Sequence, residues 1–261
     1  YSCEGGIPIM NEISVISLIL SSSLVFIAIL LSYYQKLGMG KDIIIAAIRC
    51  VVQLVAVGYI LQFIFDIRHP AVTTSLLLVI IFNAARNAAQ RGEGIPRVFL
   101  LSFLSFVASC AIILSILILT QSISYAPDQV IPITGMIVGN SMSALGLTYR
   151  QMLKEFTEGK EQVEAKLALG ADVSEASIHI VRSALKTALQ PTIDSTKTVG
   201  LVALPGMMTG QILAGQDPIQ AIKYQIMVMF MILASASIVT FTASFFAYRG
   251  FYNAKKQLRN S

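Results

Sequence analysis

Residues 98–120 read VFLLSFLSFVASCAIILSILILT, a run of 23 residues without a charged side chain. A helix needs about 20 mostly apolar residues to cross the hydrocarbon core of a bilayer, which is about 30 Å thick. The whole chain of 261 residues is 55% hydrophobic and only 13% charged, whereas about 25% of the residues in an ordinary soluble domain are charged. Its mean hydropathy is +0.73. The bilayer is therefore the expected solvent of this chain.

Further apolar runs of similar length occur on both sides of this stretch. Only helices and closed barrels satisfy every backbone group in lipid, and these continuous runs lack the alternating pattern of barrel strands. The sequence predicts an all-α fold, a polytopic membrane helical bundle of about seven transmembrane helices. The predicted spans are 12–33, 43–65, 71–90, 98–120, 130–149, 190–212 and 218–247. We expect residues 10–261 to form a single transmembrane domain and interpret residues 1–9, before Met10-Asn11-Glu12, as an added or upstream extension.

The positions of the cations predict the orientation of the bundle, since cytoplasmic loops are enriched in Lys and Arg. Cations follow the first, third, fifth and last predicted spans, and the intervening loops are short and poor in cations. The cations are Lys36, Lys41, Arg86, Arg91, Arg97, Arg150, Lys154, Lys160, Lys166, Arg249, Lys255, Lys256 and Arg259. We therefore expect the N-terminus outside and the C-terminus in the cytoplasm, in the inner or plasma membrane of a cell.

The longest polar segment is the predicted cytoplasmic loop at about 151–189. It contains two helical signals separated by Gly170, where a helix can end in a left-handed cap. Asp172, with Glu175 three residues later, is a candidate capping box for a second helix that runs towards Ala188. Gln190-Pro191 suits the entry of the chain into the next membrane span.

Motifs for ATP binding and for catalysis are missing from the sequence. It contains no GxxxxGK[ST] phosphate loop, no HExxH helix and no GxSxG elbow. The three cysteines form no CxxC pair, and the basic residues form no aromatic-laced face of the kind that binds nucleic acid. We therefore expect no enzyme, no cofactor bound by this chain and no nucleic-acid partner. Any work driven by ATP would have to come from a separate subunit.

Polar residues inside two predicted spans are candidates for a translocation pathway, because such residues are costly in lipid. Arg49 and Gln53 are four residues apart on the second span, and Asn83 and Asn87 have the same spacing on the third. Each pair therefore shares one helix face, and the two helices are expected to face each other or a wet cavity. The alternatives are that Arg49 extends to the inner membrane surface and that the amides hold helices together.

Two later spans combine glycine, polar residues and methionine. The fifth contains Gly135-Met136-Ile137-Val138-Gly139-Asn140-Ser141-Met142, and the sixth contains Leu204-Pro205-Gly206-Met207-Met208-Thr209-Gly210-Gln211. Proline frees a backbone carbonyl, glycine allows close approach, and thioethers are soft metal ligands. The alternative is a tight packing seam with methionine as filler. The pathway candidates here are Asn140, Ser141, Met142, Met207, Met208, Thr209 and Gln211, and the weak candidates for contact with a metal are Met136, Met142, Met207 and Met208.

Taken together, these motifs resemble those of a known family of transporters. Glu164-Ala165, followed by Ala168-Leu169-Gly170-Ala171, is similar to the EAA loop by which membrane subunits of ABC transporters dock on their ATPases. With Pro132-x-x-Gly135-Met136-x-x-Gly139-Asn140-Ser141-Met142 and the Leu-Pro-Gly-Met-Met-Thr-Gly-Gln block at 204–211, the chain resembles the FetB family of ABC permeases.

The resemblance implies a permease that works with a separate FetA-type ATPase, which carries ATP and Mg²⁺. We expect the permease to form a homodimer. It also implies export of iron, or another metal, and relief of oxidative stress. Glu164, Ala165, Ala168, Leu169, Gly170 and Ala171 would then couple the chain to the ATPase.

The alternative function is a secondary transporter or channel for a metal ion or small organic solute, which would need no motor. Two observations speak against it: no acidic residue was evident at a membrane centre, and the sequence shows no inverted repeat. An intramembrane enzyme is a third class, and it lacks a nucleophile–base pair or a set of metal ligands.

Overall fold

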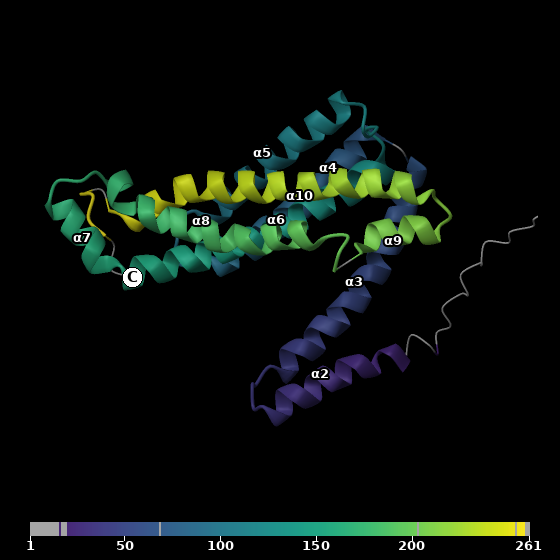
Figure 1. The fold of residues 1–261 in the computed structure, drawn as a ribbon, viewed down its shortest axis with the longest axis horizontal. Coiled ribbons are helices and arrows are strands. Elements are labelled where there is room, and N and C mark those ends of the chain that lie inside the picture. Colours follow the sequence, from purple (N-terminus) through teal and green to yellow (C-terminus); the bar gives the residue numbers. More distant parts are fainter. Residues whose placement is uncertain (1–15, 17–19, 68, 203, 254, 259–261) are drawn as a thin grey trace, which may run out of the picture. The chain divides into compact units, whose positions relative to one another are not determined.

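The chain is helical in a computed structural model that describes residues 16, 20–67, 69–202, 204–253 and 255–258. In Figure 1 the helices are α2 (Ser23–Tyr34), α3 (Gly40–Ile67), α4 (Pro70–Arg91), α5 (Val98–Leu119), α6 (Pro127–Glu158), α7 (Lys160–Ala168), α8 (Val173–Thr198), α9 (Gly206–Leu213), α10 (Pro218–Ala247) and the 3-10 helix η1 (Tyr248–Phe251). The described residues form no strand, only one isolated bridge between Tyr252 and Leu258. The predicted all-α fold is confirmed.

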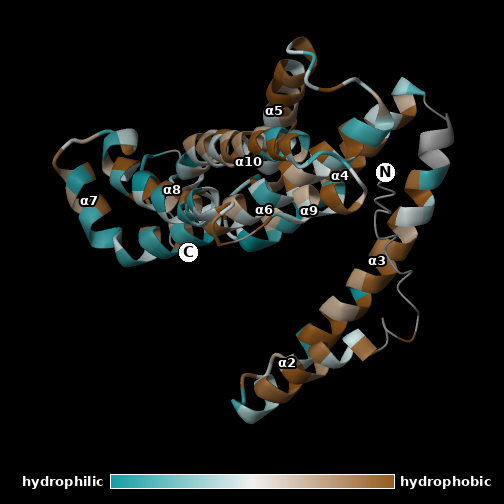
Figure 2. Ribbon diagram, turned by 45° about the vertical axis from the view of Figure 1, so that its right-hand side comes forward, coloured by the Kyte–Doolittle hydropathy of each residue, from teal (hydrophilic) through white to brown (hydrophobic). Residues whose placement is uncertain are grey.

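Five helical segments within the described ranges are long and apolar enough to cross a membrane, which makes the protein a multi-pass membrane protein. They are Gly40–Gln62, Pro70–Arg91, Val98–Leu119, Pro127–Glu158 and Pro218–Phe251. Figure 2 shows α5 as hydrophobic along its length and α7 as largely hydrophilic. The first predicted span, 12–33, lies partly outside the described residues, and residues 23–33 of it belong to the shorter apolar helix α2.

The predicted span at 190–212 is wrong as a continuous helix. Helix α8 passes through Pro191 and ends at Thr198, and the eight-residue helix α9 begins only at Gly206. Between them Gly200 has a φ of +83°, a left-handed conformation that glycine adopts without strain. Pro205 then favours an extended residue before it, which ends helical geometry on that side. The membrane entry predicted at Gln190-Pro191 is also wrong, because this dipeptide lies inside α8.

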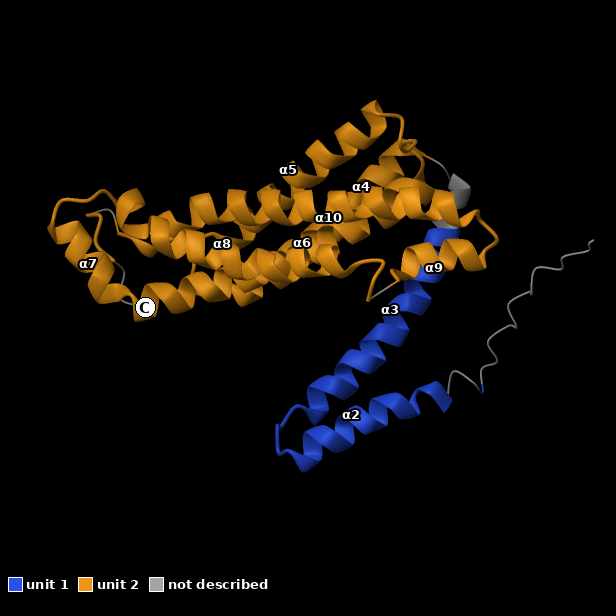
Figure 3. Cartoon of the chain, in the orientation of Figure 1, with its two compact units in different colours: residues 1–68 blue, residues 69–261 orange. Residues whose placement is uncertain are grey.

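The chain divides into two compact units, which Figure 3 shows in different colours. Residues 1–68 form the first unit, in which α2 packs against α3. Residues 69–261 form the second unit, in which α6 contacts α4, α8 and α10, and α10 also contacts α5 and α9. The largest fully buried side chains include Tyr149, Phe106, Ile137, Leu145 and Met152. The core of this unit is therefore built around α6.

Small hydroxyl side chains join α5, α6 and α10 at the centre of the second unit. Ser109 of α5 donates to Ser235 of α10 at 3.2 Å, and the Ser141 hydroxyl of α6 also bonds the Ser235 hydroxyl. All three residues are fully buried. Hydroxyls of this kind hold membrane helices together, because they allow close approach and satisfy each other in an apolar interior.

The loops of the second unit gather at its two ends in the pattern that the cations predict. At one end, the loop after α4 meets the C-terminal segment: a Cβ on Gly250 would lie 2.9 Å from Cδ of Pro96. At the other end, Thr74 and Tyr125 share a hydrogen bond of 2.7 Å between their hydroxyls. The cation-rich segments at 91–97 and 249–256 thus share one end. That this end faces the cytoplasm stays a prediction.

Candidate coupling elbow and polar cavity

The candidate coupling elbow, residues 164–171, comprises the second half of α7 and the turn that leads to α8. Helix α7 ends at Ala168, with Leu169 as its C-cap, and Gly170 follows with a φ of +93°. Asp172 then caps α8 in a capping box, in which the Asp172 N–H donates to Oε2 of Glu175 at 3.3 Å. The predicted break at Gly170 and the predicted capping box are both confirmed. Together they turn the chain sharply between two helices.

The outer side of the elbow is exposed and includes several small and apolar residues. Leu169 is 89% exposed, and Glu164, Ala165, Ala168 and Gly170 are exposed beside it. A Cβ on Gly170 would meet no atom within 4 Å. A leucine this exposed at the tip of a polar turn contributes no burial to its own fold. It is instead available to a partner, which the sequence predicts to be an ATPase.

The inner side of the elbow is anchored to the rest of the second unit. Val163 of α7 is only 2% exposed. Beyond the elbow, the Ser177 and Tyr252 hydroxyls are 2.6 Å apart in a buried hydrogen bond. Nζ of Lys256 lies 2.9 Å from Oδ1 of Asp172. This Lys256 ammonium lowers the pKa of Asp172 to about 2 from its usual 3.8, assisted by hydrogen bonds from Val173 and Ser174.

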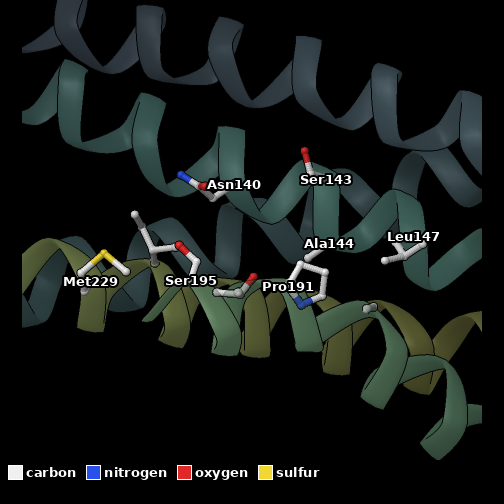
Figure 4. A pocket seen from close by; sticks show the side chains of 10 residues that line it. Asn140, Ser143, Ala144, Leu147, Pro191, Ser195 and Met229 are labelled. Carbon is white, nitrogen blue, oxygen red and sulfur yellow. The ribbon is translucent and has the colours of Figure 1, made fainter. Parts of the chain in front are cut away.

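A cavity of about 270 Å³ lies between α6, α8 and α10 (Figure 4). Its lining is mostly apolar, and we call it the polar cavity after the four polar side chains that it contains. It is lined by Asn140, Ser143, Ala144, Leu147, Ala188, Pro191, Thr192, Ser195, Met229 and Ile232. Nδ2 of Asn140 donates to the Met136 carbonyl at 2.9 Å, and its oxygen keeps no bond among the described residues. Pro191 lacks an N–H and leaves the carbonyl four residues earlier, that of Thr187, without its helical donor. The cavity therefore offers neutral oxygen atoms and one thioether.

The neighbours Asn140 and Ser141 lie in different surroundings. Asn140 is exposed and lines the cavity, whereas Ser141 is fully buried in the hydroxyl contact with Ser235. Adjacent residues on a helix point about 100° apart, so one helix can present both a cavity face and a packing face. The structure thus places the two predicted pathway residues in separate environments, and only Asn140 reaches the cavity.

Sequence reasoning missed Ser143, Thr192, Ser195 and Met229. Two pairs, Asn140 with Ser143 and Thr192 with Ser195, have a spacing of three, which places each pair on one helix face. That spacing is the sequence signal from which the polar faces of the two helices could have been predicted. It was overlooked because residues 190–198 were assigned to an apolar span.

Helix α4 has one polar face and one packed face. Asn83, Arg86, Asn87 and Gln90 are exposed, whereas Ile81, Ala84, Ala85 and Ala88 are buried. Nδ2 of Asn83 donates to the Val79 carbonyl at 2.9 Å. Arg49 and Gln53 are exposed on α3, in the first unit. Asn83 and Asn87 share one face of α4, as predicted. That α3 and α4 face each other stays a prediction.

The predicted residues of α9 occupy its half-buried and exposed sides. Met207 and Met208 are half-buried, and exposed Thr209 donates to the Pro205 carbonyl at 3.1 Å. Gln211 Oε1 is buried and has no hydrogen-bond partner among the described residues. Met136 and Met142 are half-buried on α6. The described part of the chain contains no group of three or more His, Cys, Asp or Glu side chains that could hold a metal ion.

Comparison with known proteins places the chain among membrane proteins of one family. It is 47% identical over 242 residues to the probable iron export permease protein FetB of Escherichia coli K12, covering 93% of each chain. It is 38% identical over 250 residues to the membrane protein YjkA of Bacillus subtilis 168, covering 94% of this chain and 98% of that one.

A plant relative is the Arabidopsis thaliana protein ALUMINUM SENSITIVE 3, which is 36% identical over 235 residues, 90% of this chain and 86% of that one. No solved structure matches the chain. The model of the Uncharacterised protein family UPF0014 matches residues 15–252, which include both the elbow and the cavity. The chain therefore belongs to the UPF0014 family of membrane proteins.

Proposed function

We propose that this chain is the membrane-spanning permease subunit of an ATP-driven exporter of iron, and that a separate FetA-type ATPase docks on the coupling elbow. The observation that carries the proposal is Leu169, which is 89% exposed at the tip of an elbow that is anchored on its inner side. The relative from E. coli, named as a probable iron export permease, supports the choice of iron.

The elbow continues directly into the wall of the polar cavity. Helix α8 begins at Val173, next to the elbow, and the same helix supplies Pro191, Thr192 and Ser195 to the cavity. From Val173 to Thr192 the helix rises about 28 Å, at 1.5 Å per residue. A displacement of the elbow by an ATPase would therefore move one wall of the cavity. The capping box at Asp172 keeps the start of this helix formed during such a movement.

The cavity suits the transit of a metal better than its storage. Its polar groups are a neutral amide, three hydroxyls and a thioether, while a hard trivalent ion prefers anionic oxygen ligands. Ferrous iron or a chelated form of iron is easier to reconcile with these groups. Weak neutral ligands also let the ion leave again, which transport requires.

A second copy of the chain would complete the pathway. In the second unit Asn140, Ser143 and Ser195 are exposed, as are Asn83 and Asn87 on α4. Polar groups exposed on membrane helices are costly unless they face protein or a water-filled cavity. A permease homodimer would cover such faces and place two coupling elbows under one pathway, one for each ATPase subunit.

The docking part of the proposal is tested by binding of a purified FetA-type ATPase from the same source to the chain in nanodiscs. Leu169→Asp should weaken binding at least about tenfold, a loss of about 1.4 kcal/mol. Leu37→Asp is the matched control, because Leu37 is 61% exposed in the loop after α2, which the cations place on the same side. Equal binding by both variants and the wild type would contradict docking on the elbow.

One observation favours the second candidate function, a transporter without a motor. Asp194 lies in α8, within the segment 190–212 that the sequence predicts as a span, and it was not considered there as an acid. Its Oδ1 accepts a hydrogen bond from Gln190 at 2.8 Å and lies 3.8 Å from Nζ of Lys197. Proton-driven carriers use such acids. Iron flux by the chain alone, abolished in Asp194→Asn, would favour this function over an ATPase-driven one.

A further inference from the structure

The C-terminal tail, of which the structure describes residues 248–253 and 255–258, folds back onto the coupling elbow. Figure 1 shows this segment, in yellow, beside α7 and the start of α8. The rings of Phe251 and Phe156 stack with centroids 4.1 Å apart, and Tyr252 is only 8% exposed. The bridge between Tyr252 and Leu258 turns the tail back on itself. The tail therefore has a defined course over the α6 and α8 ends.

A groove of about 560 Å³ separates the tail from α7. Its walls are Glu164, Leu167 and Ala171 on one side and Lys255, Lys256, Gln257 and Leu258 on the other. Three of the wall residues, Glu164, Leu167 and Ala171, also belong to the coupling elbow. The groove is thus continuous with the surface that carries Leu169.

Among the described residues, two cations near this groove have no ion-pair partner. Lys256 pairs with Asp172 at 2.9 Å, and Glu164 pairs with Lys160 at 3.8 Å. Lys166 and Lys255 are exposed, and within the described part of the chain neither forms a salt bridge. Glu164 and Asp172 are therefore both engaged, and the groove presents net positive charge to whatever enters it.

We propose that the tail is a second half of the docking surface, and that an acidic segment of the ATPase enters the groove between α7 and residues 255–258. The inference rests on the proposed function and adds to it a contact that the EAA-like elbow does not supply. Leu169 provides the apolar contact, while Lys166 and Lys255 provide electrostatic attraction and set the orientation of the partner. Charged rims act in this way, mainly on the association rate and on its salt dependence.

The test measures the affinity of the full-length chain in nanodiscs for the FetA-type ATPase at low and high salt. Lys255→Glu should weaken binding about tenfold at low salt and reduce the salt dependence, because opposite charges attract less strongly when screened. Lys186→Glu is the matched control: Lys186 is exposed on α8 and lies about 20 Å along the helix from its start. It should bind as the wild type does.

The outcomes separate this inference from the proposed function. Weakening by both Leu169→Asp and Lys255→Glu supports both. Weakening by Leu169→Asp alone overturns the role of the tail and leaves docking on the elbow intact. If the wild type binds no ATPase at all, both the proposed function and this inference are overturned. If Lys255→Glu leaves ATPase affinity unchanged but lowers binding to phosphatidylglycerol vesicles, the groove faces the membrane surface and the inference is overturned.

Discussion

The Ser177 hydroxyl of α8 and the Tyr252 hydroxyl of the C-terminal tail lie 2.6 Å apart in a buried hydrogen bond. Ser177 is fully buried, and Tyr252 is 8% exposed. This bond links the helix that leaves the coupling elbow to the segment that follows α10. Since α8 and α10 both line the cavity, the bond connects two of the three cavity helices next to the elbow.

Tyr252→Phe should destabilise the protein by about 1–2 kcal/mol, because it leaves the Ser177 hydroxyl buried without a partner. Ser177→Ala combined with Tyr252→Phe should recover part of this loss, since neither group is then unpaired. Thermal unfolding in detergent measures both effects. Tyr33→Phe, at a position 86% exposed, should change nothing. An unaltered transition for Tyr252→Phe would show that the bond does not hold the tail.

The Asp172–Lys256 contact should depend on pH only in strong acid. Because the folded protein holds the pKa of Asp172 at about 2 instead of 3.8, the contact stabilises the fold fully above pH 3.8. Its contribution falls as the pH drops towards 2. An NMR titration of labelled aspartate should give a pKa near 2, which Lys256→Met raises. Titration of Asp172 at its usual pKa in the wild type would show that the ion pair does not form.

Asn140→Leu should lower iron flux and Ser141→Ala should lower stability, although the two residues are adjacent. Asn140→Leu removes a polar group from the cavity and should lower iron flux about tenfold, ~1.4 kcal/mol in the barrier, with little change in thermal stability. Ser141→Ala removes a hydroxyl from the contact with Ser235 and should cost about 0.6 kcal/mol, at most ~1.7, while flux is retained. The reverse pattern would exchange the roles assigned to the two faces of α6.

Met229→Leu should lower ferrous iron flux without unfolding the protein. Leucine nearly conserves the volume of methionine, so the substitution should cost less than about 1.5 kcal/mol, but it removes the one thioether that lines the cavity. Met227→Leu, at a half-buried position outside the lining residues, is the matched control. Flux and melting temperature are measured for both variants. Equal flux in the two would mean that Met229 only fills space.

The fold class and the elbow could be predicted from sequence because their signals are local. An uncharged run such as 98–120 can only be a helix in lipid, and Gly170 with the Asp172–Glu175 pair marks a helix end and a helix start within a few residues. The prediction of a continuous span at 190–212 was wrong because the average hydropathy does not show two local breaks in the helix, at Gly200 and before Pro205. The charged residues Asp194 and Lys197 indicate that this segment is not uniformly apolar.

The cavity could be predicted only in part, because it depends on which helices meet. Asn140 was found from its own polarity, but its partners Thr192 and Ser195 lie about fifty residues away in sequence and come together only when α6 packs on α8. The position of the tail could not be predicted either. Nothing in the local sequence around Tyr252 or Lys255 indicates that the segment after α10 packs against the elbow.

The central claim is that a motor drives iron through this chain by way of the coupling elbow. Its most direct test is ATP-dependent ferrous iron flux in liposomes that contain the chain and the FetA-type ATPase, with Gly170→Arg beside the wild type. Gly38→Arg is the matched control, since both glycines have a positive φ and open space around the Cβ position. The account predicts flux that requires ATP, persists in Gly38→Arg and is lost in Gly170→Arg. Equal flux in both variants, or iron flux that needs no ATPase, would contradict it.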